Sequence, residues 1–113
     1  MKEKPSQGLL NLTRTILVRI FDEEITELPD EYLEVLSGIV LHHLIFSLPE
    51  REGVVLNRRF ERAKTFRAIG DELGVSRERA RQIALRAIYR LQGKAKADLV
   101  KTMQDFGNER AQS

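Results

Sequence analysis

The chain contains no cysteine and no tryptophan, and it has only two histidines. The absence of cysteine excludes disulfides, thiolate catalysis and cysteine-ligated zinc. The two histidines, His42 and His43, are neighbours whose side chains would leave a helix about 100° apart, a poor arrangement for a shared metal. The longest apolar run, residues 39–46, contains both histidines and is far too short to cross a membrane. We therefore predict neither a metal site nor a membrane segment.

Patterns typical of catalysis or secretion are also missing. The first residues, MKEKPSQG, lack the apolar stretch of a secretory signal, which favours the cytoplasm. Six acidic residues lie between positions 22 and 31, but adjacent carboxylates point apart and suit a solvated linker better than an acid–base pair. There is no nucleophile–base arrangement and no Gly-rich phosphate loop. The sequence therefore predicts a protein that is not an enzyme and needs no cofactor.

Charge is divided unevenly along the chain. Residues 1–56 hold five basic and ten acidic residues, a net charge of −5, whereas residues 57–97 hold twelve basic and four acidic residues, a net charge of +8. A protein that faces nucleic acid on one side is expected to show such asymmetry. A solvated charged face would give the same composition, so the charge pattern leaves both interpretations open.

Apolar residues recur at helical spacing along most of the chain, and no segment is typical of a strand. The pattern predicts an all-α protein, a compact bundle of about five helices with a helix-turn-helix in its C-terminal half. Gly93 is expected to end the last of these helices or to bend it into a further helix that reaches Met103. The predicted helices cover residues 8–22, about 29–48, 49–62, 66–73 and 77–92. The predicted organisation is an N-terminal amphipathic helix with an acidic linker (1–28), a helix-turn-helix domain (29–104) and a disordered tail (105–113).

The first predicted helix carries more apolar residues than a surface helix needs. One interpretation is that it completes the core of this small domain. The other is that it forms a partner or homodimer surface, because a small domain rarely leaves such a stripe exposed.

Residues 65–91 meet the separate demands of a helix-turn-helix. Thr65 and Ser76 are suited to cap the two helices. Gly74 lies where the chain needs a left-handed residue, and Gly70 places a minimal side chain where the first helix approaches the second. The inward faces are predicted to be Phe66, Ile69 and Leu73 on the first helix and Ala80, Ile83, Ala87 and Leu91 on the second.

The outward face of the second helix has a pattern suited to the DNA major groove. On a helical wheel, Glu78 and Gln82 lie near its centre. Four arginines flank them, Arg79 and Arg86 on one side and Arg77 and Arg81 on the other. The centre would meet base edges and the flanks would meet phosphates. An ordinary charged, solvated helix face is the alternative. Leu85 and Tyr89 also fall outward and are expected to be buried under the C-terminal helix.

The stretch SLPEREGVVLNRRF, followed by TFRAIGDELGVSRERARQI, resembles region 4 of the sigma-70 family of bacterial transcription initiation factors. The resemblance covers roughly residues 44–95. It implies that the helix from Arg77 reads the −35 element of a promoter, with Arg77, Glu78 and Gln82 at base-contacting positions. Arg79 and Arg81 match positions that contact phosphates or neighbouring bases. Further phosphate contacts are expected from Thr65, Arg67, Ser76 and Arg86.

The resemblance also implies a protein partner. In the family, the helices before the motif dock on the flap of the RNA polymerase β subunit, which on this chain points to residues 32–60. We expect that surface to meet the flap or a sigma factor. Its candidate contact residues are Leu48, Glu50, Arg51, Val55 and Arg59. The chain departs from the family in two ways. It lacks a counterpart of the region that melts the −10 element and an aromatic cluster for stacking unpaired bases, and Arg67–Ala68 replaces the usual acidic pair.

We therefore expect a stand-alone, region-4-like regulator in the bacterial cytoplasm that does not open promoters by itself. It would tether RNA polymerase to particular promoters or replace a sigma factor's own promoter-reading domain. Two alternatives stay open. A homodimeric helix-turn-helix repressor or activator would bind paired half-sites without touching polymerase. A sigma-mimicking inhibitor would act through protein contacts and barely use DNA.

Overall fold

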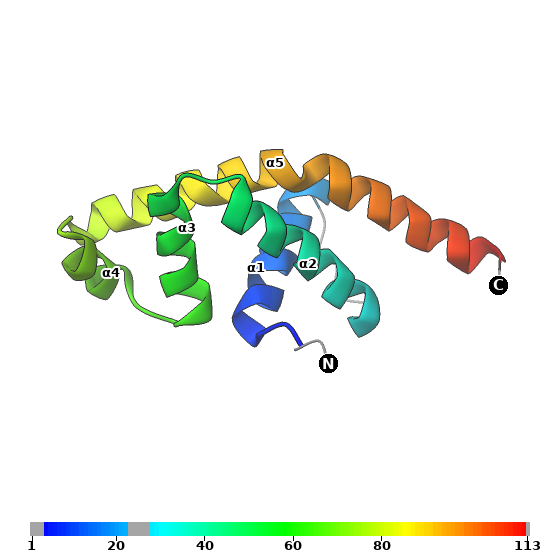
Figure 1. The fold of residues 1–113 in the computed structure, drawn as a ribbon, viewed down its shortest axis with the longest axis horizontal. Coiled ribbons are helices and arrows are strands. Elements are labelled where there is room, and N and C mark those ends of the chain that lie inside the picture. Colours follow the sequence, from blue (N-terminus) through cyan, green and yellow to red (C-terminus); the bar gives the residue numbers. More distant parts are fainter. Residues whose placement is uncertain (1–3, 23–27, 113) are drawn as a thin grey trace.

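The computed structural model describes residues 4–22 and 28–112, and side chains within this part up to Gly107. Every element in the described residues is a helix, which confirms the predicted all-α class (Figure 1). The elements are α1 (Gln7–Phe21), α2 (Asp30–Phe46), α3 (Glu50–Leu56), a π-helical turn η1 (Asn57–Glu61) that continues α3, α4 (Phe66–Leu73) and α5 (Arg77–Gln112).

The starts of the first three helices follow from residues that suit a helix N-terminus. Ser6 caps α1, because its hydroxyl accepts a hydrogen bond from the Leu9 amide at 3.0 Å. Pro29 and Pro49 precede α2 and α3 with φ near −55°, a value that leads into a helix without strain. The predicted boundaries of these helices are confirmed to within about two residues, with the predicted helix 49–62 divided between α3 and η1.

Helix α5 is much longer than predicted. Its 36 residues span about 54 Å at the usual rise, which matches the 53 Å length of the molecule. Gly93 does not end the helix, because Leu91 and Ala95 on either side of it are completely buried and hold it on the core. The helix runs past Met103 to Gln112, across most of the segment for which a disordered tail is predicted.

Near its C-terminal end, α5 is fixed to the start of α2. The Phe106 ring stacks on Tyr32 with the ring centres 3.9 Å apart. Near the other end of α2, the His43 imidazole lies between the Ser47 hydroxyl at 2.9 Å and the Asp98 carboxylate of α5 at 2.8 Å. His43 is half-buried and His42 is exposed.

The core lies along one face of α5, against which the other helices pack (Figure 1). The first helix contributes four of the buried apolar side chains, Leu9, Leu12, Ile16 and Leu17, so the interpretation that it completes the core is confirmed. α1 also crosses η1 so closely that a Cβ at Gly8 would overlap the Phe60 carbonyl. None of the described helices is both long and apolar enough to span a membrane.

Candidate nucleic-acid interface

The turn between α4 and α5 has the geometry that the sequence predicts. The Thr65 hydroxyl accepts from the Ala68 amide at 3.1 Å, and the Ser76 hydroxyl accepts from the Arg79 amide at 3.0 Å. Each helix therefore has a capped N-terminus. Gly74 adopts a left-handed conformation with φ of 71°, in which other residues are strained.

Gly70 fixes how closely the turn packs on α4. A Cβ at this position would lie 2.6 Å from the Val75 carbonyl oxygen and 3.0 Å from the Ser76 carbonyl oxygen. The Gly70 carbonyl in turn accepts a hydrogen bond from the Val75 amide at 2.9 Å. Because these neighbours are backbone atoms, a side chain at position 70 would displace the start of α5.

The first turns of α5 are oriented by their buried face. Ala80, Ile83 and Ala87 are at most 5% exposed, and they pack in the same core as Ile69 of α4. Small side chains at positions 80 and 87 let α5 lie close to its neighbours. With one face fixed in this way, the opposite face must point to solvent.

All the side chains predicted to meet DNA are exposed. Along α5 these are Arg77, Glu78, Arg79, Arg81, Gln82 and Arg86; Thr65 and Arg67 on the α4 side and Ser76 in the turn are exposed as well. The structure therefore brings the predicted base-contacting and phosphate-contacting residues of α5 together on one exposed face of its first three turns. Donors and acceptors of this kind, set on a convex helix, are suited to base edges and phosphates in a major groove.

Glu78 and Arg81 are joined, although the sequence analysis gives them separate positions on the face. Arg81 Nη2 lies 2.6 Å from Glu78 Oε1, and Arg81 Nε donates to Glu78 Oε2 at 3.0 Å. This hydrogen-bonded partner holds the pKa of the Glu78 carboxyl below its usual range. Glu78 is therefore an anionic acceptor at neutral pH, and the pair presents it next to a guanidinium donor.

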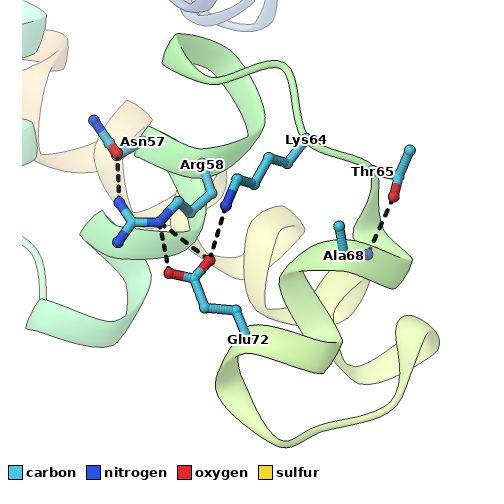
Figure 2. A network of polar contacts seen from close by, with 6 residues as sticks. All are labelled: Asn57, Arg58, Lys64, Thr65, Ala68 and Glu72. Atoms are coloured by element: carbon cyan, nitrogen blue, oxygen red, sulfur yellow. Dashed lines mark hydrogen bonds and ion pairs between the residues drawn. The ribbon is translucent and has the colours of Figure 1, made fainter.

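A second polar network fixes α4 against η1 (Figure 2). Arg58 Nε donates to both Glu72 oxygens, at 2.9 and 3.2 Å, and Lys64 Nζ lies 3.6 Å from Glu72 Oε2. Arg58 Nη1 also donates to Asn57 Oδ1 at 2.7 Å. The Arg58 hydrogen bonds hold the pKa of the Glu72 carboxyl below its usual value. Sequence spacing gives no signal for this network, because fourteen positions separate Arg58 from Glu72.

The expectation that Leu85 and Tyr89 are covered by a C-terminal helix is wrong. Leu85 is 48% exposed and Tyr89 is 70% exposed. Among the described residues no helix covers them, because α5 continues through Gly93 instead of folding back. Both side chains therefore lie on the open surface of α5, one and two turns beyond Gln82.

The residues expected to contact polymerase are placed very differently from one another. Leu48 and Glu50 line a hollow of about 470 Å³ between the end of α2 and α3–η1. Arg51 is exposed on α3, but Val55 is completely buried in the core. The Arg59 guanidinium lies 4.4 Å from the Phe66 ring centre and donates to the Lys64 carbonyl, so it already has partners within the domain.

Three exposed apolar residues of α2 were missed as candidates for this surface. Leu41 and Ile45 line the same hollow and are 39% and 59% exposed, and Phe46 beside them is 74% exposed. The unbroken apolar character of residues 39–46 was the available signal, because a helix with one buried face needs only part of such a run.

The comparison with known protein families agrees with this geometry. Residues 44–93 match the family model described as sigma-70, region 4. No curated protein and no solved structure matches the chain. The matched segment begins at the end of α2 and includes the hollow's α3–η1 wall, the helix-turn-helix and the first half of α5. By this match, residues 44–93 are similar to region 4 of the sigma-70 family.

Proposed function

We propose that this protein is a sequence-specific transcription regulator that reads a −35-like promoter element with the first three turns of α5. The observation that carries the proposal is the exposed face of α5, fixed by a capped and sterically constrained turn, within a domain of a DNA-binding family. The +8 charge of residues 57–97 adds the general attraction to DNA that such a protein needs.

The residues of this face divide into two roles. The Gln82 amide is suited to bind adenine through two hydrogen bonds, and the Glu78 carboxylate is suited to accept from the cytosine amino group. Arg77 would reach a base at the start of the helix. The other exposed groups around the turn would position the helix on phosphates: Thr65, Arg67, Ser76, Arg79, Arg81 and Arg86. Phosphate contacts fix the register of the protein and base contacts select the sequence.

The hollow between α2 and α3–η1 is the proposed contact with RNA polymerase. Leu41, Ile45 and Leu48 leave apolar surface in it, and Glu50 and Glu61 lie among its polar lining. An apolar groove of this kind accepts one face of an amphipathic helix. The hollow lies mainly within the segment that matches region 4, which supports the polymerase β flap as the proposed occupant.

Selection of bound duplexes from a random pool tests the DNA-reading proposal. The selection is made with the chain alone and with the chain plus RNA polymerase, at one stated salt concentration, because phosphate contacts depend on salt. We expect the selection to enrich one −35-like element, and we expect this enrichment to be stronger when RNA polymerase is present. Enrichment of two half-sites about one helical turn apart would favour the homodimer instead. Equal binding to every duplex under both conditions would contradict sequence-specific reading and favour the sigma-mimicking inhibitor.

A pair of matched variants tests the polymerase contact. Ile45→Glu puts a charge into the hollow from a position that is already 59% exposed, so the core is not disturbed. We expect it to abolish the effect of polymerase on the selection while the chain's own binding to DNA is kept. Val35→Glu, on the same helix but outside this hollow, is the control. An Ile45→Glu protein that still responds fully to polymerase would remove this surface from the proposal.

A further inference from the structure

A second hollow lies outside the segment that matches region 4. It has a volume of about 630 Å³ and is formed by the residues that begin α1 and by the outward face of α2. Leu9 lies at its α1 side, and Val35 and Leu41 at its α2 side. Val35 is 52% exposed and Leu41 is 39% exposed, so this face of α2 leaves apolar surface in contact with water.

Gly38 lies in this hollow, in the middle of α2. A glycine within a helix lowers its stability relative to alanine, so its presence needs a reason. At Gly8 and Gly70 the fold itself supplies that reason, because a Cβ would collide with nearby backbone. At Gly38 a Cβ would meet nothing within 4 Å. The missing side chain therefore serves no contact among the described residues, and it leaves the helix backbone open to close approach from outside.

The rim of the hollow is acidic. Glu31 and Glu34 line it from α2, are exposed, and form no ion pair with a described residue. Among the described residues that line it, Lys4 is the one basic residue. Two copies of the chain joined through this face would bring the Glu31 and Glu34 carboxylates of both copies together, which opposes self-association. A positively charged partner would be attracted instead.

We propose that this hollow binds an amphipathic helix of a partner protein whose apolar stripe is flanked by lysine or arginine. The apolar side chains would enter between Val35, Leu41 and Leu9, and the partner's backbone would approach α2 at Gly38. The basic flanks would pair with Glu31 and Glu34. Binding of the apolar face of an amphipathic helix in a groove is a common recognition mode. The site is separate from the DNA-facing end of α5, so the proposal stands whether or not the proposed promoter reading is correct.

The test is a selection of helical peptides displayed with a randomised apolar stripe and randomised flanks, using the full chain as bait. Gly38→Phe adds a large side chain to the hollow from a position where a Cβ meets nothing within 4 Å, and it serves for counter-selection. Gly38→Ala is the graded comparison, because it adds only one methyl group at the point where the partner's backbone would approach and also raises helix propensity. We expect enriched peptides with basic flanks, whose affinity falls at least about tenfold for Gly38→Phe and by a smaller factor for Gly38→Ala. The proposal would be overturned if the selection enriched no peptide that binds the wild-type chain more tightly than the Gly38→Phe chain.

Reversal of charge gives an independent arm. Glu31→Lys combined with Glu34→Lys should weaken the selected peptides roughly tenfold at low salt and favour variants of them with glutamate flanks. Both Gly38→Phe and the charge reversal should leave DNA binding unchanged. Peptides that bind the charge-reversed chain as tightly as the wild type would overturn the proposal. Peptides whose binding is lost in the Ile45→Glu chain but kept in the Gly38→Phe chain would also overturn it. Self-association of the chain that Gly38→Phe abolishes would also overturn it, in favour of a second copy as occupant.

Discussion

Three glycine-to-alanine substitutions measure whether the helix-turn-helix is packed as described. Each adds one methyl group, but the surroundings differ. At Gly70 the new Cβ would lie 2.6 Å from the Val75 carbonyl oxygen. At Gly74 the new Cβ would have no neighbour within 4 Å, although the backbone there has a φ of 71°. At Gly93 the new Cβ would also have no neighbour within 4 Å, and the residue lies in an ordinary α-helix. The same chemical change is therefore expected to give three different results.

The magnitudes follow from these surroundings. Gly70→Ala forces a backbone displacement and should lower the free energy of unfolding by about 1–3 kcal/mol, as overpacking does. Gly74→Ala should lower it by roughly 1–2 kcal/mol, the cost of a left-handed alanine. Gly93→Ala should raise it by about 0.5–1 kcal/mol, because alanine is the better helix former and the site is open. Urea titrations at one pH, followed by circular dichroism, give all three values.

DNA affinity separates the two destabilising variants. Gly70→Ala displaces the start of α5, so the folded variant should bind a selected duplex more weakly than the wild type. Gly74→Ala changes no packing contact and should bind normally once its folded fraction is taken into account. The reasoning would be refuted if Gly70→Ala and Gly93→Ala unfolded at the same urea concentration, because steric contact at position 70 would then be absent.

Further predictions concern the cap, the Glu72 network and the exposed aromatic residue. Ser76→Ala should lower the free energy of unfolding by about 1 kcal/mol, because the helix loses its N-cap. Ser76→Asp should keep the cap but weaken DNA binding, because its carboxylate repels phosphate. If Ser76→Ala were as stable as the wild type, the capping role of Ser76 would be contradicted. Arg58 lowers the pKa of Glu72 in the folded protein from its ordinary 4.5, so this carboxylate contributes stability above pH 4.5 that is lost as the pH falls through the lowered pKa. Arg58→Gln should therefore be less stable than the wild type near neutral pH, and the difference should shrink in unfolding titrations as the pH falls below 4.5. A difference independent of pH would refute the role of Glu72. Tyr89→Ala should change the stability by less than about 0.5 kcal/mol, because Tyr89 is 70% exposed, and a larger loss in urea titration would show that it is covered.

The helix-turn-helix could be predicted from the sequence because its determinants are local. The caps at Thr65 and Ser76 and the left-handed Gly74 act within a few residues of the chain, and the structure has all of them where the pattern places them. The inward face of α5 was predictable for a similar reason, since a period of 3.6 residues places Ala80, Ile83 and Ala87 on one side.

The features that were missed depend on contacts between distant segments. Gly93 is a plausible helix end by local rules, but the burial of Leu91 and Ala95 overrides its low helix propensity. The error at Leu85 and Tyr89 follows from the same mistake, because a helix that does not end cannot fold back. The pairing of Arg58 with Glu72 and the two hollows along α2 arise only after the helices have packed. Spacing within one helix contains no information about the Arg58–Glu72 pair or the shape of the hollows, although the apolar run 39–46 indicates that some apolar side chains of α2 stay exposed.

The most direct test of the central claim is a comparison of Gln82→Ala with Arg79→Ala on the selected duplex and on a scrambled duplex, over a series of salt concentrations. Gln82→Ala should reduce the preference for the selected duplex by about 1–3 kcal/mol and leave the salt dependence unchanged. Arg79→Ala should weaken binding to both duplexes alike and reduce the salt slope by about one counterion. If both variants lower affinity for the two duplexes equally, the exposed face of α5 attracts DNA by charge alone and does not read its sequence.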